Sequence, residues 1–270
     1  MLKNKKIKFA LSKYDILFIH ETHCTLEMEF HMDNFKAFNN PCTLSSSERP
    51  RGGCVMFVKN HLIKHVTCVD KNFNDSIILY MMNTVICGFY IPPDTSKYFD
   101  TQMDLLETLS VYDKTDPRKI LICGDLNSRI GVVNSLNGEV YQPNPDATLN
   151  QHGRRLLTIC ESNNLVPLNM LIKNQTRFRS GFTFHRGNLK SQNDWIICSK
   201  NLVDCVSEFD FIDDMFNLSD HIPIFSTVKL KVDLDLDLVY DNIQYMLDEK
   251  NNHSRFKKIS NGKHRYKHIC

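Results

Sequence analysis

The sequence has no run of apolar residues long enough to cross a membrane. A membrane-spanning helix needs roughly 18 consecutive apolar residues, and no window of the 270-residue chain approaches that length. Lysines near the N-terminus (Lys3, Lys5, Lys6 and Lys8) are not followed by an apolar stretch that could act as a signal peptide. We therefore expect no membrane partner and an intracellular location, nuclear or cytoplasmic.

The sequence also lacks the cysteine spacings of zinc sites and of redox pairs. Its 10 cysteines are spread singly, with no CxxC pair and no Cys/His spacing suited to zinc. Several, such as Cys87, Cys123 and Cys198, fall inside apolar runs. We expect most cysteines to be reduced, buried and inert, which is typical of a reducing compartment.

There is no excess of charge of either sign, and no internal repeat is visible. The net charge is +2 and 42% of the residues are hydrophobic, which is typical of a globular protein with a core to bury. Net charge therefore indicates no partner, and a basic surface would have to come from a local cluster such as Arg177, Arg179 and Arg186. For the N-terminal lysines, a solvated face is the better interpretation.

One domain is expected over residues 1–230, followed by a tail over 231–270. The composition changes after Lys231, first to the alternating DLDLDL of 233–238 and then to a basic stretch at 253–268. We expect the tail to be partly helical near 240–249 and disordered beyond. Its basic end either contacts nucleic acid or is simply solvated, and we favour the second interpretation. The protein is expected to be a monomer.

Hydrophobic periodicity predicts strands alternating with a few helices, an α/β architecture. Helices are expected at 2–14, 97–111 and 153–163, and long loops at 39–51 and 132–152. Strands are expected at 15–20, 52–59, 64–70, 76–81, 84–91, 120–123, 181–185, 194–199 and 224–230.

The stretch GDLNSRIG at 124–131 follows a buried apolar strand and carries Asp125 and Asn127. Residues two apart on an extended backbone point the same way, so these two side chains can face one pocket. From this octapeptide alone, a plain turn in which Asp and Asn bond their own backbone is an equally good interpretation.

Further strand ends carry acidic side chains beside polar or imidazole neighbours. Glu21 lies between His20 and His23, Asp194 follows Asn193, and Asp220 precedes His221. Several such ends in one domain predict an anionic pocket rich in oxygen ligands, which suits a hard cation such as Mg²⁺.

Taken in order, these motifs resemble a known superfamily. HETH at 20–23, GFYIPPD at 88–94, GDLNSRIG at 124–131, SQNDWIICS at 191–199 and LSDHIPI at 218–224 look like those of the endonuclease/exonuclease/phosphatase (DNase I-like) superfamily. The match covers about residues 15–230. The SRIG ending and the stretch RRLLTICESNNLVPLN at 154–169 look most like non-LTR retrotransposon, apurinic/apyrimidinic-like endonuclease domains.

The resemblance implies a four-layer α/β/β/α sandwich of two packed, mostly antiparallel sheets, with the pocket at one end of the sheets. It also implies Mg²⁺ as cofactor, with Mn²⁺ as a substitute, and duplex DNA as partner. Glu21 is the implied metal ligand, with Asp220 nearby, directly or through water. Asp125 is implied to orient or deprotonate the attacking water.

The remaining implied roles concern the phosphate. Asn127 and Tyr90 would bind it, while His221, paired with Asp194, would hold the scissile phosphate as it gains charge. A histidine kept protonated by a buried carboxylate donates a stronger hydrogen bond than a neutral one. Substrate contacts are also expected from Ser191, Thr183 and Arg129, although a structural hydrogen bond is an equally good interpretation for Ser191 and Thr183.

The sequence departs from the family pattern in ways that bear on activity. The family's first strand, which carries an asparagine supporting the metal, lies about thirty residues before the motif glutamate, and only twenty residues precede Glu21 here. The N-terminal strand is therefore expected to be missing. Trp195 replaces a Tyr or His, and His20 stands where the family has Gln; we interpret His20 and His23 as supporting residues rather than metal ligands.

The sequence thus predicts a metal-dependent phosphodiesterase that nicks DNA, of retrotransposon and reverse-transcriptase-associated type, impaired by the loss of the first strand. Nothing after residue 230 resembles a reverse transcriptase. Two alternatives stay open: a phosphatase of the same fold acting on small phosphoesters or lipids, and a catalytically dead module that still binds nucleic acid.

Overall fold

The computed structural model describes residues 5–25, 29–42, 51–93, 99–115, 119–172, 181–212 and 219–230. The chain separates into two compact units, Met1–Lys231 and Val232–Cys270. All described residues belong to the first unit, so the predictions made for the tail lie outside them. None of the helices in the described part is long and apolar enough to span a membrane.

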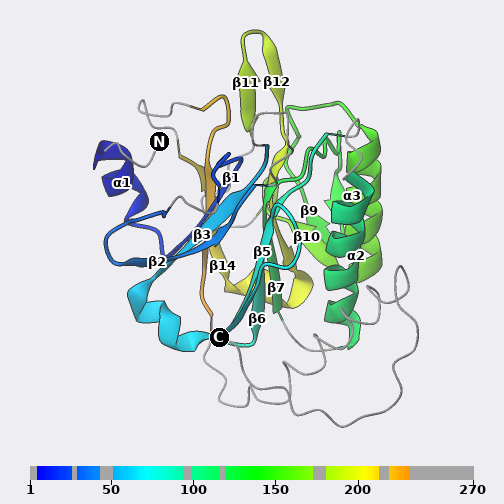
Figure 1. Ribbon diagram of the computed structural model, residues 1–270. Coiled ribbons are helices and arrows are strands. Elements are labelled where there is room, and N and C mark those ends of the chain that lie inside the picture. The colour runs from blue at the N-terminus through cyan, green and yellow to red at the C-terminus, as the bar shows by residue number, and fades with distance from the viewer. Residues whose placement is uncertain are drawn as a thin grey trace, which may run out of the picture. The chain divides into compact units, whose positions relative to one another are not determined.

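A six-stranded sheet forms the centre of the first unit (Figure 1). Its strand order is β10-β13-β7-β6-β5-β4. The strands are β4 (Val66–Asp70), β5 (Ser76–Met81), β6 (Thr84–Tyr90), β7 (Lys119–Asp125), β10 (Leu165–Pro167) and β13 (Asp194–Ser199). All neighbours are antiparallel except β6 and β7, which are parallel. A parallel pair needs a crossover connection, and helix α2 (Phe99–Thr115) lies in that connection.

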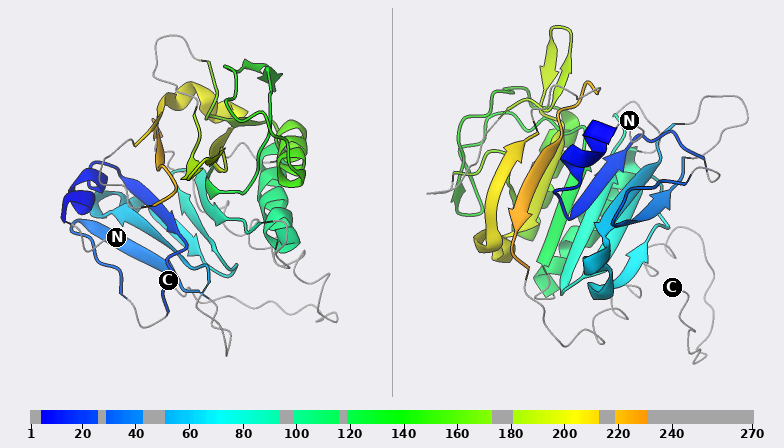
Figure 2. Two further views of the ribbon diagram at one scale, coloured as in Figure 1. Left: turned by 90° about the horizontal axis from the view of Figure 1, so that it is seen from above. Right: turned by 90° about the vertical axis from the view of Figure 1, so that its left-hand side faces the viewer.

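The two long helices, α2 and α3 (Gln151–Asn163), cover one face of this sheet, as the view from above shows (Figure 2). The opposite face is covered by two smaller groups of strands and, outside them, by α1 (Lys5–Leu11). The groups are β1-β3-β2, made of Ile16–His20, Cys54–Lys59 and Phe35–Asn40, and β14-β15, made of Val206–Phe211 and Ile224–Val228. The expected layered α/β sandwich is thereby confirmed.

The remaining elements are short. They are the 3₁₀ helices η1 (Asn60–His65) and η2 (Lys200–Cys205) and the hairpins β8-β9 (Ser135–Leu136, Glu139–Val140) and β11-β12 (Phe184–Arg186, Leu189–Ser191). Sequence patterns missed β2, β10, β12 and β14. The first residues of the strand expected at 64–70 belong to η1, and the strand expected at 181–185 begins only at Phe184. The β8-β9 hairpin lies within the stretch expected to be a loop.

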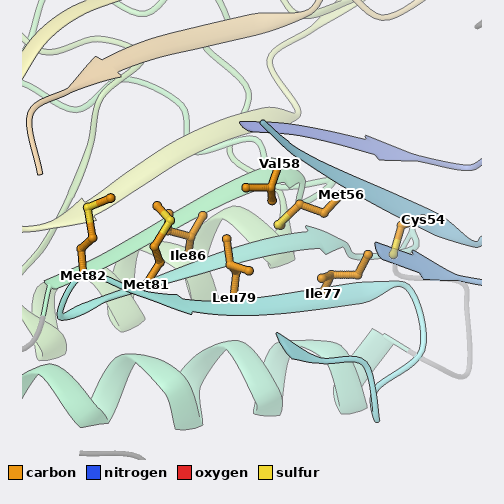
Figure 3. Packing of buried hydrophobic residues seen from close by; sticks show 8 residues of the cluster. All are labelled: Cys54, Met56, Val58, Ile77, Leu79, Met81, Met82 and Ile86. Atoms are coloured by element: carbon orange, nitrogen blue, oxygen red, sulfur yellow. The ribbon is translucent and has the colours of Figure 1, made fainter. Parts of the chain in front are cut away.

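The core between the layers is built from residues that face each other across the sheets (Figure 3). Met56 and Val58 of β3 belong to one buried cluster with Ile77 and Leu79 of β5, and all of them are fully buried. Burying each of these side chains contributes about 1.5–3 kcal/mol. Phe18 of β1 is partly buried against the same cluster. Gly88 provides its space, because a Cβ there would lie 2.1 Å from the Phe18 ring.

The second layer is interrupted between β1 and β15. Among the described strands, β1 pairs only with β3 and β15 only with β14. The face of β7 that looks toward this layer is also incompletely covered: Leu121 and Cys123 are partly exposed, whereas Ile120 and Ile122 on the other face are buried. The second layer is thus interrupted over a central strand among the described residues. The expected loss of the family's first strand stays a prediction.

Candidate active site

Two aspartates face each other at the end of the central sheet. In the antiparallel register of β7 and β13, Asp125 is the direct partner of Asp194. Both are buried, with 3% and 7% of their surface exposed. Like charges placed opposite each other on a sheet are destabilising, so this pair needs compensating positive charge.

The turn after β7 holds Asp125 through its own backbone. Gly124 has φ +135°, and a Cβ there would lie 1.9 Å from the Phe89 carbonyl oxygen, so only glycine fits. The Asn127 backbone N–H donates to Asp125 Oδ1 (2.8 Å), and Asn127 Nδ2 donates to the Ile91 carbonyl (2.8 Å). The turn interpretation of GDLN is therefore correct, and the hydrogen bonds that close the turn also orient the Asp125 carboxylate. A pocket shared by Asp125 and Asn127 stays a prediction.

His221 supplies part of the compensating charge. Its Nδ1 lies 2.8 Å from Asp194 Oδ2, and its Nε2 lies 3.9 Å from Asp125 Oδ2. Burial opposes protonation of His221, but the hydrogen bond and charge of Asp194, with further charge from Asp125 and Asp220, raise its pKa to about 9. His221 is therefore expected to be an imidazolium at neutral pH, with the Asp194 side of the ring fixed.

The pKa values of the two aspartates are shifted in opposite directions. Burial followed by the charge of Asp194 raises the pKa of Asp125 to about 7. Burial would also raise the pKa of Asp194, but hydrogen bonds and charge from His20 and His221 lower it to about 2. Carboxyl groups with separated pKa values are typical of sites in which one group accepts a proton and the other stays ionised.

Replacing Asp194 with asparagine is expected to lower the pKa of His221 from about 9, because the hydrogen bond and charge that raise it most are then lost while burial still acts. A histidine with a raised pKa stabilises the fold fully below its unfolded pKa, and this stability is lost as the pH rises through about 9. The variant should lose that dependence. NMR titration of the ring and denaturation at pH 6 to 10 measure both, and an unchanged His221 pKa would contradict the pairing.

Backbone hydrogen bonds fix the position of Asp194. Thr183 Oγ1 accepts from the backbone N–H groups of Asn193 and Asp194 (3.0 Å each), and Asn169 Nδ2 donates to the Asp194 carbonyl (2.8 Å). Thr183 is fully buried. Ser191 is also buried and pairs with Phe184 in the β11-β12 hairpin. These positions favour the structural interpretation of Thr183 and Ser191; phosphate contact by either stays a prediction.

Glu21, Tyr90 and Asp75 form the other side of the site. Burial, then the charge and hydrogen bond of Glu21, raise the pKa of Tyr90. Burial and the charge of Glu21 also raise the pKa of Asp75, whose Oδ1 accepts from the Gly53 N–H (2.6 Å). Sequence reasoning missed Asp75, because it follows no long apolar run and belongs to none of the recognised motifs.

The remaining predicted residues lie at the margin of the candidate site. Asp220 is exposed beside His221, and its carbonyl accepts from the His185 N–H (2.8 Å). Arg129 forms a forked ion pair with buried Asp146, at 2.8 Å from Nε to Oδ2 and 2.6 Å from Nη2 to Oδ1. Because most of this guanidinium is engaged, the pair primarily ties together two loops. Substrate contact by Arg129 stays a prediction.

His20 is the residue whose position the sequence did not reveal. Its ring stacks on Tyr90 (centroids 5.4 Å apart, planes 12° apart) and meets His221 edge-on at 5.9 Å. Its Nε2 lies 3.6 Å from Asp194 Oδ1, so Asp194 has an imidazole on each side. The available signals were its adjacency to Glu21 in the HETH motif and its position where the family has Gln, which led to its interpretation as a supporting residue.

Residues 84–225 match the model of a family described as Endonuclease-reverse transcriptase. No curated protein sequence matches the chain significantly.

Solved structures share the fold at low sequence identity. An AP endonuclease from Leishmania major has a TM-score of 0.60 and 15% identity, with 83% of this chain and 82% of that chain covered. A 3'-5' exonuclease from Neisseria meningitidis has a TM-score of 0.59 and 13% identity, with 83% and 93% covered. The endonuclease domain of TRAS1, a telomere-specific non-LTR retrotransposon, has a TM-score of 0.55 and 16% identity, with 84% and 91% covered.

Proposed function

Because the chain belongs to the endonuclease-reverse transcriptase family within the DNase I-like superfamily, we propose that it is a Mg²⁺-dependent endonuclease that nicks one strand of duplex DNA. The observation that carries the proposal is the Asp125, Asp194 and His221 arrangement at the end of the central sheet. Nicking of the retrotransposon type would leave a 3′-hydroxyl.

The residues of this chain divide the proposed reaction between them. Asp125 accepts a proton from the attacking water, a role suited to a carboxylate whose pKa is raised to about 7. His221 donates to the phosphate oxygen on which charge develops, and Asp194 keeps its ring oriented and protonated. Asn127 and Tyr90 contribute further donors to the phosphate.

The residues proposed to hold the cation are oxygen donors, which suit a hard ion. Glu21 is exposed, and its charge acts with burial to raise the pKa values of Tyr90 and Asp75. Glu21 and Asp220 would hold Mg²⁺, or Mn²⁺ in its place, through oxygen ligands. When bound, the ion supplies charge neutralisation at the phosphate and the leaving oxygen.

A plasmid-nicking assay tests this proposal. Supercoiled DNA should be converted to the open circular form with Mg²⁺, not with EDTA, and extension by a DNA polymerase from the nick should show a free 3′-hydroxyl. If the folded protein binds duplex DNA but does not nick it with either Mg²⁺ or Mn²⁺, the proposed enzymatic activity is contradicted.

The interrupted second layer supports a different candidate, a module that binds DNA without cleaving it. β1 carries His20 and leads into Glu21, and its outer edge has no strand partner among the described residues. If that interruption disables the metal side of the site, an added N-terminal strand of alternating apolar residues should raise both the melting temperature and the nicking rate. The control is an equally long extension with prolines at consecutive positions, which removes N–H donors from both sides of the strand and prevents pairing with a sheet edge.

A further inference from the structure

Three side chains that are distant in the sequence converge on one point. His20 comes from β1 of the second layer, while Asp125 and Asp194 end β7 and begin β13 of the central sheet. One ligand atom from each lies within 4.8 Å of the others, and no other trio of His, Cys, Asp or Glu in the described residues meets this condition. The group is enclosed, because both carboxylates are buried and the His20 side chain is only 17% exposed.

The contact between His20 and Asp194 is unusual in length. Its 3.6 Å from Nε2 to Oδ1 exceeds the usual 2.7–3.2 Å of an N–H···O hydrogen bond. The other ring nitrogen, Nδ1, is buried without a hydrogen-bond partner in the structure. Two ligands bound at about 2.0–2.1 Å to a tetrahedral ion lie about 3.3 Å apart. The observed separation is close to the edge of a metal coordination shell and longer than the usual hydrogen bond, although the contact is near enough for His20 to lower the pKa of Asp194.

Each aspartate already has one oxygen engaged and presents the other. Asp125 Oδ1 accepts from the Asn127 N–H at 2.8 Å, and Asp194 Oδ2 pairs with His221 Nδ1 at 2.8 Å. Asp125 Oδ2 has only longer contacts, 3.4 Å to Asn127 Nδ2 and 3.9 Å to His221 Nε2. Partners that hold the second atom of a ligand orient the first toward a metal.

The His20 ring is held as firmly as the carboxylates. Tyr90 lies against its face and His221 meets it edge-on. Its strand is paired along its whole length with β3, from Ile16 opposite Val58 to His20 opposite Cys54. A fixed ring and two fixed carboxylates lose little conformational freedom when they bind an ion.

We propose that His20, Asp125 and Asp194 form a binding site for Zn²⁺, distinct from the proposed Mg²⁺ ligands Glu21 and Asp220. One imidazole nitrogen and two carboxylate oxygens are a donor set of zinc sites, whereas Mg²⁺ prefers oxygen alone. The two buried carboxylates also contribute two negative charges toward a divalent ion.

Occupation of this site has a functional consequence, which rests on the proposed nuclease function. Zn²⁺ would take the oxygen of Asp125 that otherwise accepts the proton of water, and it would place a cation beside His221. We therefore expect Zn²⁺ to inhibit nicking even when Mg²⁺ is present in excess. The site would make the enzyme sensitive to zinc through His20, a residue outside the proposed reaction.

Zinc binding is measured first without DNA, so the outcome does not depend on catalysis. Isothermal titration with ZnCl₂ should show one site per chain, and Zn²⁺ should raise the melting temperature. His20→Gln, which keeps a polar side chain of similar size, should weaken binding at least about tenfold and remove most of the thermal shift. His23→Gln is the matched control, because His23 is exposed and lies outside the trio; it should bind as the unaltered protein does.

Cobalt distinguishes this site from binding by cysteine. Co²⁺ in the proposed site should show visible d–d bands without the near-ultraviolet thiolate charge-transfer band that a cysteine ligand produces. Equal zinc affinity in the unaltered protein and in folded His20→Gln, or a thiolate band, would overturn the proposal. So would the absence of zinc binding to the folded protein.

The nicking assay then separates the site from the function. With Mg²⁺ present, Zn²⁺ should lower the nicking rate of the unaltered protein and of His23→Gln, and lower that of His20→Gln much less. If zinc binds through His20 but no nicking is detected under any condition, the metal site stands and the proposed function fails. If nicking occurs and Zn²⁺ inhibits both variants equally, the assignment of the inhibitory site to His20 fails.

Discussion

Replacing Asp125 with asparagine is expected to lower the rate of Mg²⁺-dependent nicking by about a hundredfold to ten-thousandfold, the range lost when a general base is removed. The amide cannot accept the proton of the attacking water, although it keeps the shape of the carboxylate. His221→Ala should cost about a hundredfold to a thousandfold, because it removes a donor aimed at the developing charge. Both rates are measured by conversion of supercoiled plasmid under single-turnover conditions.

The fold should survive the Asp125 substitution. It removes one of two buried carboxylates that lie opposite each other, so the melting temperature should stay the same or rise. Asp33→Asn is the matched control, because Asp33 has a side chain 88% exposed and pairs only with His31 among the described residues. Activity untouched by both Asp125→Asn and His221→Ala would contradict the assignment of the site.

Replacing Asp146 with alanine is expected to lower the free energy of unfolding by about 3 kcal/mol, toward the low end for breaking a buried ion pair. The Asp146 side chain is 2% exposed, and it accepts from Arg129 and from the backbone N–H groups of Gln192 and Thr148. Removing the Asp146 carboxylate leaves these donors without their acceptor. The low end applies because the Arg129 side chain is 31% exposed and can be partly hydrated. Urea denaturation measures the change.

The same ion pair predicts a pH dependence. Burial would raise the pKa of Asp146, but the hydrogen bonds from Arg129, Gln192 and Thr148 and the charge of Arg129 lower it below 3.8. Its stabilising contribution is therefore present above its unfolded pKa and is lost as the pH falls through the lower folded value. Asp204→Ala, at an exposed position in η2, should change stability by less than about 0.5 kcal/mol. Equal stabilities of the two variants at pH 7 would contradict the role of Asp146.

The loop that contains the Arg129–Asp146 ion pair is also attached to the active-site turn. Asn150 Oδ1 accepts from the Arg129 N–H (3.0 Å), and Asn150 Nδ2 donates to the Asn127 carbonyl (2.9 Å). The loop that follows GDLN is thereby attached to the start of α3. The sequence placed Arg129 among the substrate contacts because it lies in the motif; its ion pair with Asp146, seventeen residues away, could not be read from spacing in an irregular loop.

The sequence alone determined the central strands and the residues proposed for the site. The apolar runs of β6 and β13 are almost entirely buried, and that of β7 alternates between buried and partly exposed residues. Their apolar composition sufficed to place all three strands. Acidic residues at the ends of those runs, taken in order with the other motifs, predicted that Asp125, Asp194 and His221 meet. Local signals suffice where a residue's position follows from the end of a strand.

Contacts between segments that are distant in the sequence became visible only in the tertiary structure. The two imidazoles on Asp194, the Asp75 carboxylate beside Glu21 and the interruption between β1 and β15 depend on contacts across layers. Short or polar strands such as β2 and β14 carry too little periodic signal to be seen before their partners are known. Strand composition thus determined which residues reach the site, while sheet packing decided that His20 faces the two aspartates.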